Sequence, residues 1–175
     1  MNNELLHNTI ITLRAIEPED LDLFYKWEND TMYWEHGSTI VPFSRYALKQ
    51  YIQATTQDVY ETKQLRLMIE HVRDKVCLGT IDVSQIDFFH KRAEMGVFID
   101  KHYQQKGFAV MAIQLLLEYL FSFLDLEQVY CHVPKNNISS QKMLLKTGFV
   151  CVGEKKHWIR KGNEFEDVLF FQKLK

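Results

Sequence analysis

Residues 104–112 read QQKGFAVMA, and this short polar stretch decides how the chain is organised. It follows an apolar run, MGVFID at 95–100, that is typical of a strand, and it opens an apolar stretch at 109–124 that is long enough for a helix. Amides in the first turn of a helix are unpaired and the helix dipole is positive there, so this turn is suited to an anion. Gly107 lets a ligand approach the backbone closely, and Lys106 adds positive charge.

The rest of the chain alternates between strand-like and helix-like patterns. The apolar alternation predicts strands at 9–16, 64–72, 76–84, 93–99, 128–133, 149–159 and 164–174. Helices are predicted at 18–30, 44–57, 108–124 and 137–148, with Ser44 as the N-cap of the second one. Residues 31–43 are expected to be irregular. Seven strands and four helices in this order predict a mixed α/β sheet with helices on its faces.

Composition limits the possible function classes. The chain has 175 residues, a length that predicts a single domain over 1–175, and 46% of them are hydrophobic. A net charge of −2 argues against a nucleic-acid partner, and the longest apolar stretch is broken by polar residues, which argues against a membrane span. Cys77, Cys131 and Cys151 are expected to be free thiols in a reducing compartment, so a cytoplasmic protein is expected.

Two motifs in the second half of the chain carry a family resemblance. Gln104, Gly107 and Ala109 form a Q-x-x-G-x-A pattern that resembles the Q/R-x-x-G-x-G/A signature of the GNAT N-acetyltransferases. Further on, N-x-x-S at 137–140 and K-x-G-F at 146–149 are similar to the next motif of that family, with the expected spacing. Each motif alone is weak, but the two occur in order and on the expected elements.

The resemblance extends over nearly the whole chain. ITLRAIEPEDLDLF at 11–24 resembles the opening strand and helix of the family, and RAEMGVFID at 92–100 resembles the strand before the loop. It implies a mixed, mostly antiparallel central sheet of about seven strands, flanked by about four helices and splayed at a bulged fourth strand. Gly96 fits the expected bulge.

The family also implies acetyl-CoA as co-substrate. The seven histidines show no metal-ligand spacing, so no metal is expected. The resemblance assigns the pantetheine arm to the backbone of Val97, Phe98 and Ile99. It assigns the pyrophosphate to the amides of the loop, Gln104, Gln105, Lys106, Gly107, Phe108 and Ala109. Two residues of the next helix, Asn137 and Ser140, are placed beside the thioester.

Acetyl transfer to an amine needs a base, because an alkylammonium must lose a proton before it attacks. Glu94 resembles the acidic residue that relatives carry on this strand, and it is the candidate base. A surface ion pair with Lys91 or Arg92 is the alternative interpretation. Many family members carry a tyrosine as general acid seven residues after the motif asparagine, but here that position is Leu144. Ser140 is therefore the candidate that hydrogen-bonds the departing sulfur.

The acceptor site is the least defined part of the sequence. The aromatic residues at 33–37 either line the acceptor pocket or pack on the sheet, and acidic residues around them suit a cationic acceptor. His132 is interpreted as a core histidine, although it can also face the slot on its strand. The candidate acceptor-binding residues are Glu28, Tyr33, Trp34 and Glu35.

The sequence therefore predicts an enzyme that transfers acetyl from acetyl-CoA to a primary amine. The acceptor is either a polyamine or a protein N-terminal amine. The polyamine is suggested by MYW at 32–34 and HKRAE at 90–94, which look similar to bacterial spermidine acetyltransferases, and the N-terminal amine by the N-x-x-S motif. The alternative is a catalytically silent acyl-CoA-binding module, since the usual tyrosine is missing. The resemblance also implies a homodimer or larger homo-oligomer, as is common in the family.

Overall fold

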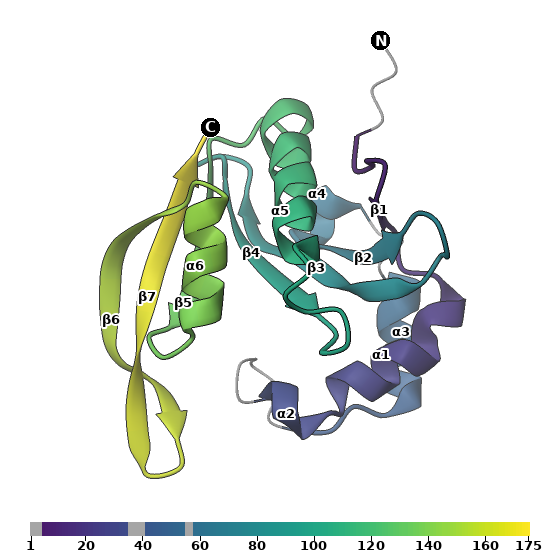
Figure 1. The fold of residues 1–175 in the computed structure, drawn as a ribbon, viewed down its shortest axis with the longest axis horizontal. Coiled ribbons are helices and arrows are strands. Elements are labelled where there is room, and N and C mark those ends of the chain that lie inside the picture. Colours follow the sequence, from purple (N-terminus) through teal and green to yellow (C-terminus); the bar gives the residue numbers. More distant parts are fainter. Residues whose placement is uncertain (1–4, 35–40, 55–57) are drawn as a thin grey trace.

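The computed structural model describes residues 5–34, 41–54 and 58–175 and is built on one seven-stranded sheet (Figure 1). The strands lie in the order β1-β2-β3-β4-β5-β7-β6. Their bounds are β1 Ile11–Arg14, β2 Leu65–His71, β3 Cys77–Asp87, β4 Arg92–Ile99, β5 Gln128–Pro134, β6 Val150–Lys161 and β7 Glu164–Leu174. Among these strands only β4 and β5 pair in parallel. The predicted mostly antiparallel sheet of seven strands is confirmed.

Four helices of eight residues or more accompany the sheet, as predicted for the described part of the chain. They are α1 Leu21–Glu28, α3 Arg45–Ala54, α5 Phe108–Glu118 and α6 Ile138–Lys146. A 3₁₀ turn at Pro18–Asp20 precedes α1, and a π-helical turn at Tyr119–Phe123 continues α5. Two single-turn helices, α2 at Thr31–Trp34 and α4 at Val59–Thr62, were not predicted, because four residues are too short to show a helical period.

The four longer helices are divided between the two faces of the sheet. α5 and α6 lie over one face, and α1 and α3 lie over the other, beside β1 to β4 (Figure 1). Side-chain alternation along β2 serves both layers, because Leu67 and Ile69 join the large core under α5 whereas Met68 joins the smaller core under α1 and α3. The described residues contain no helix that is both long and apolar enough to cross a membrane.

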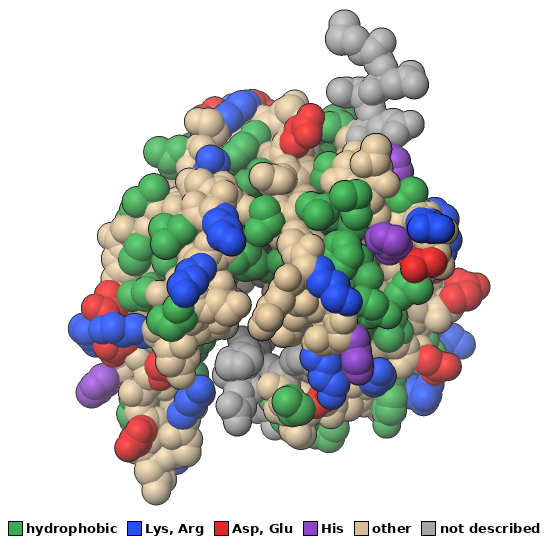
Figure 2. All heavy atoms as spheres, viewed as in Figure 1, with side chains coloured by type: hydrophobic (Ala, Val, Ile, Leu, Met, Phe, Trp, Pro, Cys, Tyr) green, Lys and Arg blue, Asp and Glu red, His purple; other side chains and the backbone are tan. Residues whose placement is uncertain are grey.

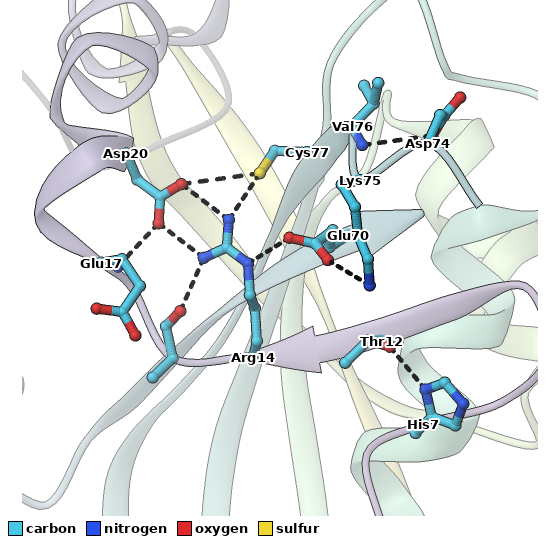
Figure 3. A network of polar contacts seen from close by, with 11 residues as sticks. His7, Thr12, Arg14, Glu17, Asp20, Glu70, Asp74, Lys75, Val76 and Cys77 are labelled. Carbon is cyan, nitrogen blue, oxygen red and sulfur yellow. Dashed lines mark hydrogen bonds and ion pairs between the residues drawn. The ribbon is translucent and has the colours of Figure 1, made fainter. Parts of the chain in front are cut away.

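A closed polar network fixes β1 to its neighbours (Figure 3). Arg14 donates through Nε to Glu70, through Nη1 and Nη2 to both oxygens of Asp20, and through its remaining donors to the carbonyl of Ala15 and to Sγ of Cys77. All five N–H groups of the guanidinium therefore have an acceptor. The carboxylates of Asp20 and Glu70 are only 8% and 13% exposed, so the network joins the start of α1 to β1, β2 and β3 with its charges paired.

Candidate active site

The site begins where β4 and β5 separate. Their parallel ladder comprises three pairs and ends at Glu94 opposite Tyr130. The splay is therefore confirmed, but the predicted bulge at Gly96 is wrong. The β3–β4 register is unbroken through Gly96, and its shift lies on β3 between Ser84 and Asp87. Gly96 instead faces open space, since a Cβ placed there would meet no atom within 4 Å. Its missing side chain keeps the gap between the strands open.

The loop after β4 has the shape of an anion-binding turn. Gln105 and Gly107 adopt positive φ angles of 61° and 84°, and Gly107 is the N-cap of α5. A glycine has no side chain to cap the helix, so the amides of the first turn of α5 receive no N-cap hydrogen bond. Gln104 donates from Nε2 to the carbonyl of Ile99 over 2.9 Å and ties the loop to the end of the strand. Lys106 donates from Nζ to the carbonyl of His102 over 3.1 Å.

A buried carboxylate, which the sequence did not reveal, holds the base of this loop. Asp100 accepts from Nε1 of Trp27 in α1 over 2.8 Å and from the amide of His102 over 3.0 Å. Burial by itself would raise the pKa of Asp100, but these hydrogen bonds from His102 and Trp27 outweigh it and lower the pKa. The ionised Asp100 thus links α1, β4 and the start of the loop.

The second motif forms the opposite wall of the gap. Asn137 is the N-cap of α6, and its Oδ1 accepts from the amide of Ser140 over 3.1 Å. Both residues line the cavity between β4 and β5. Leu144 does not line it, because its side chain is 2% exposed and packs in the large core. The position where relatives carry tyrosine is therefore part of the core packing in this chain.

One cavity of about 960 Å³ joins most of the candidate residues. On the molecular surface the face over α6 and the loop after β4 is hollowed, with Lys and Arg side chains on both sides of the hollow (Figure 2). Of the residues assigned to acetyl-CoA, Gln105, Lys106, Gly107, Phe108 and Ala109 are not part of the cavity lining. The candidate base Glu94 lines it, and so do six of the residues assigned to acetyl-CoA: Val97, Phe98, Ile99, Gln104, Asn137 and Ser140.

A hydrogen-bonded chain of three side chains lines this cavity. Oε1 of Glu94 lies 2.7 Å from Nδ1 of His132, and Nε2 of His132 lies 2.7 Å from Nζ of Lys155. A lysine ammonium can only donate, so Nε2 accepts from Lys155 and Nδ1 carries the proton that is donated to Glu94. The interpretation of His132 as a core residue is wrong. It alternates with the buried Cys131, and this period places it on the opposite, cavity-facing side of β5.

Lys155 was not predicted as a site residue, because its face on β6 depends on the β6–β7 register, which shifts between Cys151 and Gly153, before the regular pair of Lys155 with Val168. A second shift lies between Lys155 and Ile159. Asp167 holds this bulge by accepting from the amide of His157 over 2.9 Å, a contact that with Lys156 lowers the pKa of Asp167 to about 2. Such bulges re-aim side chains. Here the ammonium of Lys155 lies 4.4 Å from the ring centre of Trp158.

The predicted acceptor residues are only partly within the described chain. Glu28 and Trp34 line the cavity, and Nε1 of Trp34 donates to the carbonyl of Glu28 over 2.8 Å. Glu35 and the side chain of Tyr33 lie outside the described residues. Glu28 is paired with Arg66 at 2.9 Å, and Asp82 also accepts from Arg66. Burial raises the pKa of Asp82, although the Arg66 guanidinium beside it opposes this shift.

A second cavity of about 1040 Å³ lies on the side of the sheet that α1 and α3 leave open. His132 and Lys155 line both cavities, so the two meet at the three-residue chain. The described residues contain no group of three His, Cys, Asp or Glu side chains arranged to hold a metal ion. What the arrangement offers is a slot for an extended ligand, an anion-binding loop at one end and a carboxylate–imidazole pair at the other.

A family model described as an acetyltransferase (GNAT) domain matches residues 11–150 of the chain. Among curated relatives, a spermidine N(1)-acetyltransferase of Vibrio cholerae is 27% identical over 146 residues, which are 82% of this chain and 80% of the relative. The spermidine N(1)-acetyltransferase of Escherichia coli is 27% identical over 150 residues, 84% of this chain and 76% of the relative.

Solved structures of similar fold lead to the same group of proteins. The spermidine N-acetyltransferase of Vibrio cholerae in complex with CoA and spermine has a TM-score of 0.86 to this chain at 25% sequence identity. The superposition covers 95% of this chain and 96% of the other. A dodecameric structure of the spermidine N-acetyltransferase from the same organism has a TM-score of 0.79 at 25% identity, with 95% of each chain covered.

Proposed function

Because the chain belongs to the GNAT acetyltransferase family, it is an acetyl-CoA-dependent N-acetyltransferase, and we propose that its acceptor is a polyamine. The observation that carries this proposal is the cavity that runs from the loop after β4 to Glu94, lined at its far end by carboxylates and aromatic rings. The curated relatives that support it are spermidine N(1)-acetyltransferases.

Acetyl-CoA supplies the acetyl group as an activated thioester, and we propose that two parts of the chain hold it. The backbone of Val97, Phe98 and Ile99 pairs with the pantetheine arm, beyond the point where β5 leaves β4. The amides of residues 104–109 bind the pyrophosphate, which is supported by the positive φ angles at Gln105 and Gly107 and by the uncapped first turn of α5.

Glu94 is the proposed base. His132 donates to Oε1 of this carboxylate, which fixes its orientation and leaves Oε2 to accept the proton of the acceptor ammonium. The alternative interpretation of Glu94 as a surface partner of Lys91 or Arg92 has no support, because Lys91 pairs with Asp125 and Arg92 with Asp87. Glu94 also lies at the last β4–β5 pair, where the slot closes.

Ser140 is proposed to hydrogen-bond the departing sulfur. Its amide is fixed by Asn137 and its side chain lines the cavity, and Leu144 leaves no hydroxyl at the position of the usual tyrosine. Thiols have pKa values near 8.5, so a thiolate leaves with modest help. One hydrogen bond to a charged group contributes about 1.5–3 kcal/mol, and we therefore expect Ser140→Ala to lower kcat roughly 10–100-fold without abolishing activity.

A polyamine fits the charges and rings at the acceptor end. Glu28, Asp82 and Glu94 line the cavity, and the two cationic side chains in its lining, Arg66 and Lys155, neutralise only part of this charge. The rings of Trp34 and Trp158 also line it, and aromatic faces attract alkylammonium groups by about 0.5–2 kcal/mol. A protein N-terminal amine is the second candidate, supported by the N-x-x-S motif at 137–140.

An amine panel tests the function and the acceptor together. The protein is mixed with acetyl-CoA and, separately, with spermidine, spermine, a short peptide with a free N-terminus, and a buffer control, and CoA release is followed with a thiol reagent. We expect turnover with the two polyamines and none above the control with the peptide. Turnover with the peptide alone would replace the polyamine proposal, and CoA binding without turnover of any amine would indicate a silent acyl-CoA-binding module.

We further propose that residues 1–175 form one domain, which acts in the cytoplasm as a homo-oligomer. One hydrophobic core contains residues of β1 to β5 and of β7, which supports a single domain, and three free cysteines suit a reducing compartment. Oligomerisation is supported by the dodecamer of the Vibrio cholerae relative and by Val150, Val152 and Trp158, which are exposed on the edge strand β6. Light scattering coupled to size exclusion measures the assembly.

A further inference from the structure

Lys155 is itself a primary amine, and it ends the hydrogen-bonded chain that begins at Glu94, the proposed base for the acceptor. Its Nζ is 2.7 Å from Nε2 of His132, and Nδ1 of the same ring is 2.7 Å from Glu94. A nucleophile within hydrogen-bond distance of a base that a third group orients is the arrangement of covalent catalysis in general. From this geometry we propose that the enzyme acetylates its own Lys155 when no external amine is bound.

The surroundings of Lys155 favour this reaction over an ordinary ion pair. None of the described carboxylates pairs with the ammonium of Lys155, whereas the next residue, Lys156, pairs with Glu154 and Asp167, each at 3.0 Å. Lys155 is partly buried and lies near the rings of Trp158 and Phe170, at 4.4 and 5.9 Å from their centres. Its hydrogen-bond acceptor is the imidazole of His132.

The same cavity connects Lys155 with the residues proposed to hold acetyl-CoA. Its lining continues from Gln104 along β4 to Glu94, His132 and Lys155. The acceptor proposed above, a polyamine, ends in the same aliphatic primary amine as a lysine side chain. Lys155 therefore competes with the external acceptor for one reaction centre.

The proposed step is balanced without any further reagent. His132 accepts a proton from the Lys155 ammonium, with Glu94 stabilising the imidazolium, and the free amine attacks the thioester carbonyl. The bond between the acetyl carbon and Nζ forms as the bond between that carbon and sulfur breaks. Of the two protons that Nζ loses overall, one ends on the CoA thiol and one in solvent.

Acetylation of Lys155 would close the site to its acceptor. The acetamide carries no charge and is larger than the ammonium, and it stands at the junction of the two cavities. Because an amide does not pass its acetyl group to another amine, the product is a stable modification. Self-acetylation thus lowers activity when acetyl-CoA is abundant and the acceptor is scarce.

Mass spectrometry tests the proposal on the intact chain. The wild type is incubated with isotope-labelled acetyl-CoA, with and without spermidine, and digested peptides are quantified over time. We expect the label on Lys155, and at least tenfold slower labelling when spermidine is present. His132→Gln, which keeps a polar side chain but removes the imidazole that accepts the proton of Lys155, should slow labelling of Lys155 at least tenfold.

Lys156 provides the matched control, because it is the next residue, is more exposed and belongs to the same strand. Lys155→Arg should abolish the labelled peptide signal at 155, and Lys156→Arg should leave the rate at Lys155 unchanged. Equal labelling of Lys155 and Lys156, or a rate at Lys155 that His132→Gln does not change, indicates chemical acetylation only and overturns the proposal.

The inference rests on the proposed acetyl transfer, and one parallel measurement separates their failures. Turnover of spermidine is followed in the same samples. Spermidine acetylation without any label on Lys155 overturns self-acetylation and leaves the proposed function intact. Label on Lys155 without spermidine turnover supports self-acetylation and removes the polyamine as acceptor. Where Lys155 is labelled, the loss of spermidine turnover should follow the labelled fraction, since the modified enzyme cannot bind its acceptor.

Discussion

Two polar networks in this protein contain similar residue types and differ in how they are closed. Around Arg14, all five guanidinium donors have acceptors, and the carboxylates of Asp20 and Glu70 are almost fully buried (Figure 3). In the chain of Glu94, His132 and Lys155, each residue is partly exposed and lines a cavity. The guanidinium of the first network has no donor left for a ligand, whereas the side chains of the second can be reached by one.

This difference indicates which polar cluster stabilises the fold and which one acts on a substrate. A closed network stabilises the fold, because removing one member leaves a buried charge without its partner. An open one tolerates substitution more easily, since water replaces the lost contact, but it holds groups that a substrate can reach. Substitutions in the two networks should therefore separate stability from activity.

Arg14→Met should have the largest effect, and it should be on stability. The substitution leaves Asp20 and Glu70 as two neighbouring carboxylates with little solvent. Breaking a buried pair costs about 3–5 kcal/mol, and we expect about 3 kcal/mol because Arg14 keeps 26% of its side chain exposed. Urea unfolding measures the loss, while kcat per folded molecule should stay at the wild-type value.

Arg45→Met is the matched control for Arg14. Arg45 also pairs with an aspartate, Asp22 in the first turn of α1, but the two side chains are 56% and 83% exposed. Exposed pairs contribute about 0–1 kcal/mol, so the control should unfold close to the wild-type urea concentration. Similar losses for the two variants would mean that the Arg14 network is no more closed than a surface ion pair.

Glu94→Gln should show the opposite division of effects. Removing a general base lowers kcat about 10²-fold, or about 2.7 kcal/mol in the activation free energy. The side chain of Glu94 is 30% exposed, so the free energy of unfolding should change by less than about 1 kcal/mol. Calorimetry should find CoA affinity unchanged. A variant with wild-type kcat and pH dependence would exclude Glu94 as the general base, and another residue would then have to accept the proton.

Gly107→Val should weaken CoA binding at least tenfold, or about 1.4 kcal/mol, by disturbing the loop at the other end of the cavity. A Cβ at Gly107 meets only Cε of Met111, at 3.7 Å, so space is available, but a φ of 84° is strained for a branched residue. Gly162→Val is the control, because Gly162 also has a positive φ, 60°, in the β6–β7 turn and lines neither cavity. Equal CoA affinity in wild type and Gly107→Val would remove the loop from pyrophosphate binding.

Most of the fold could be predicted from local patterns. Strand alternation, the proline before α1 and Gly148 after α6, with its φ of 83°, are signals within a few residues, and the corresponding elements were found as expected. Ser44 caps α3 as predicted, since its Oγ accepts from the amide of Ala47 over 3.0 Å. The bulge was misplaced because a register shift is a property of two strands, and one strand alone does not reveal it.

The site was predictable only where a motif marks it. Gln104 of the loop and Asn137 and Ser140 of the N-x-x-S motif line one cavity, whereas residues 105–109 do not, and Lys155 and Asp100 were missed. Lys155 donates to His132, 23 residues earlier, and Asp100 accepts from Trp27, 73 residues earlier. Such contacts depend on tertiary structure. His132 could have been found, because alternation with Cys131 gives its face, but alternation does not tell whether that face is covered.

The smallest effect that we expect is the pH dependence of the closed network. Burial would raise the pKa of Asp20, but hydrogen bonds from Arg14 and the amide of Glu17, together with the charge of Arg14, lower it below its usual value of 3.8. A carboxyl with a lower pKa in the folded chain contributes stability that is complete above the unfolded value and is lost as pH falls through the folded value. The difference in unfolding free energy between wild type and Asp20→Asn should therefore be largest at neutral pH and shrink below about pH 4. Asp22→Asn, at an exposed position beside α3, should show a small difference at every pH. A difference for Asp20→Asn that stays constant down to about pH 3 would mean that the network depends on the shape of its hydrogen bonds and not on the charge of Asp20.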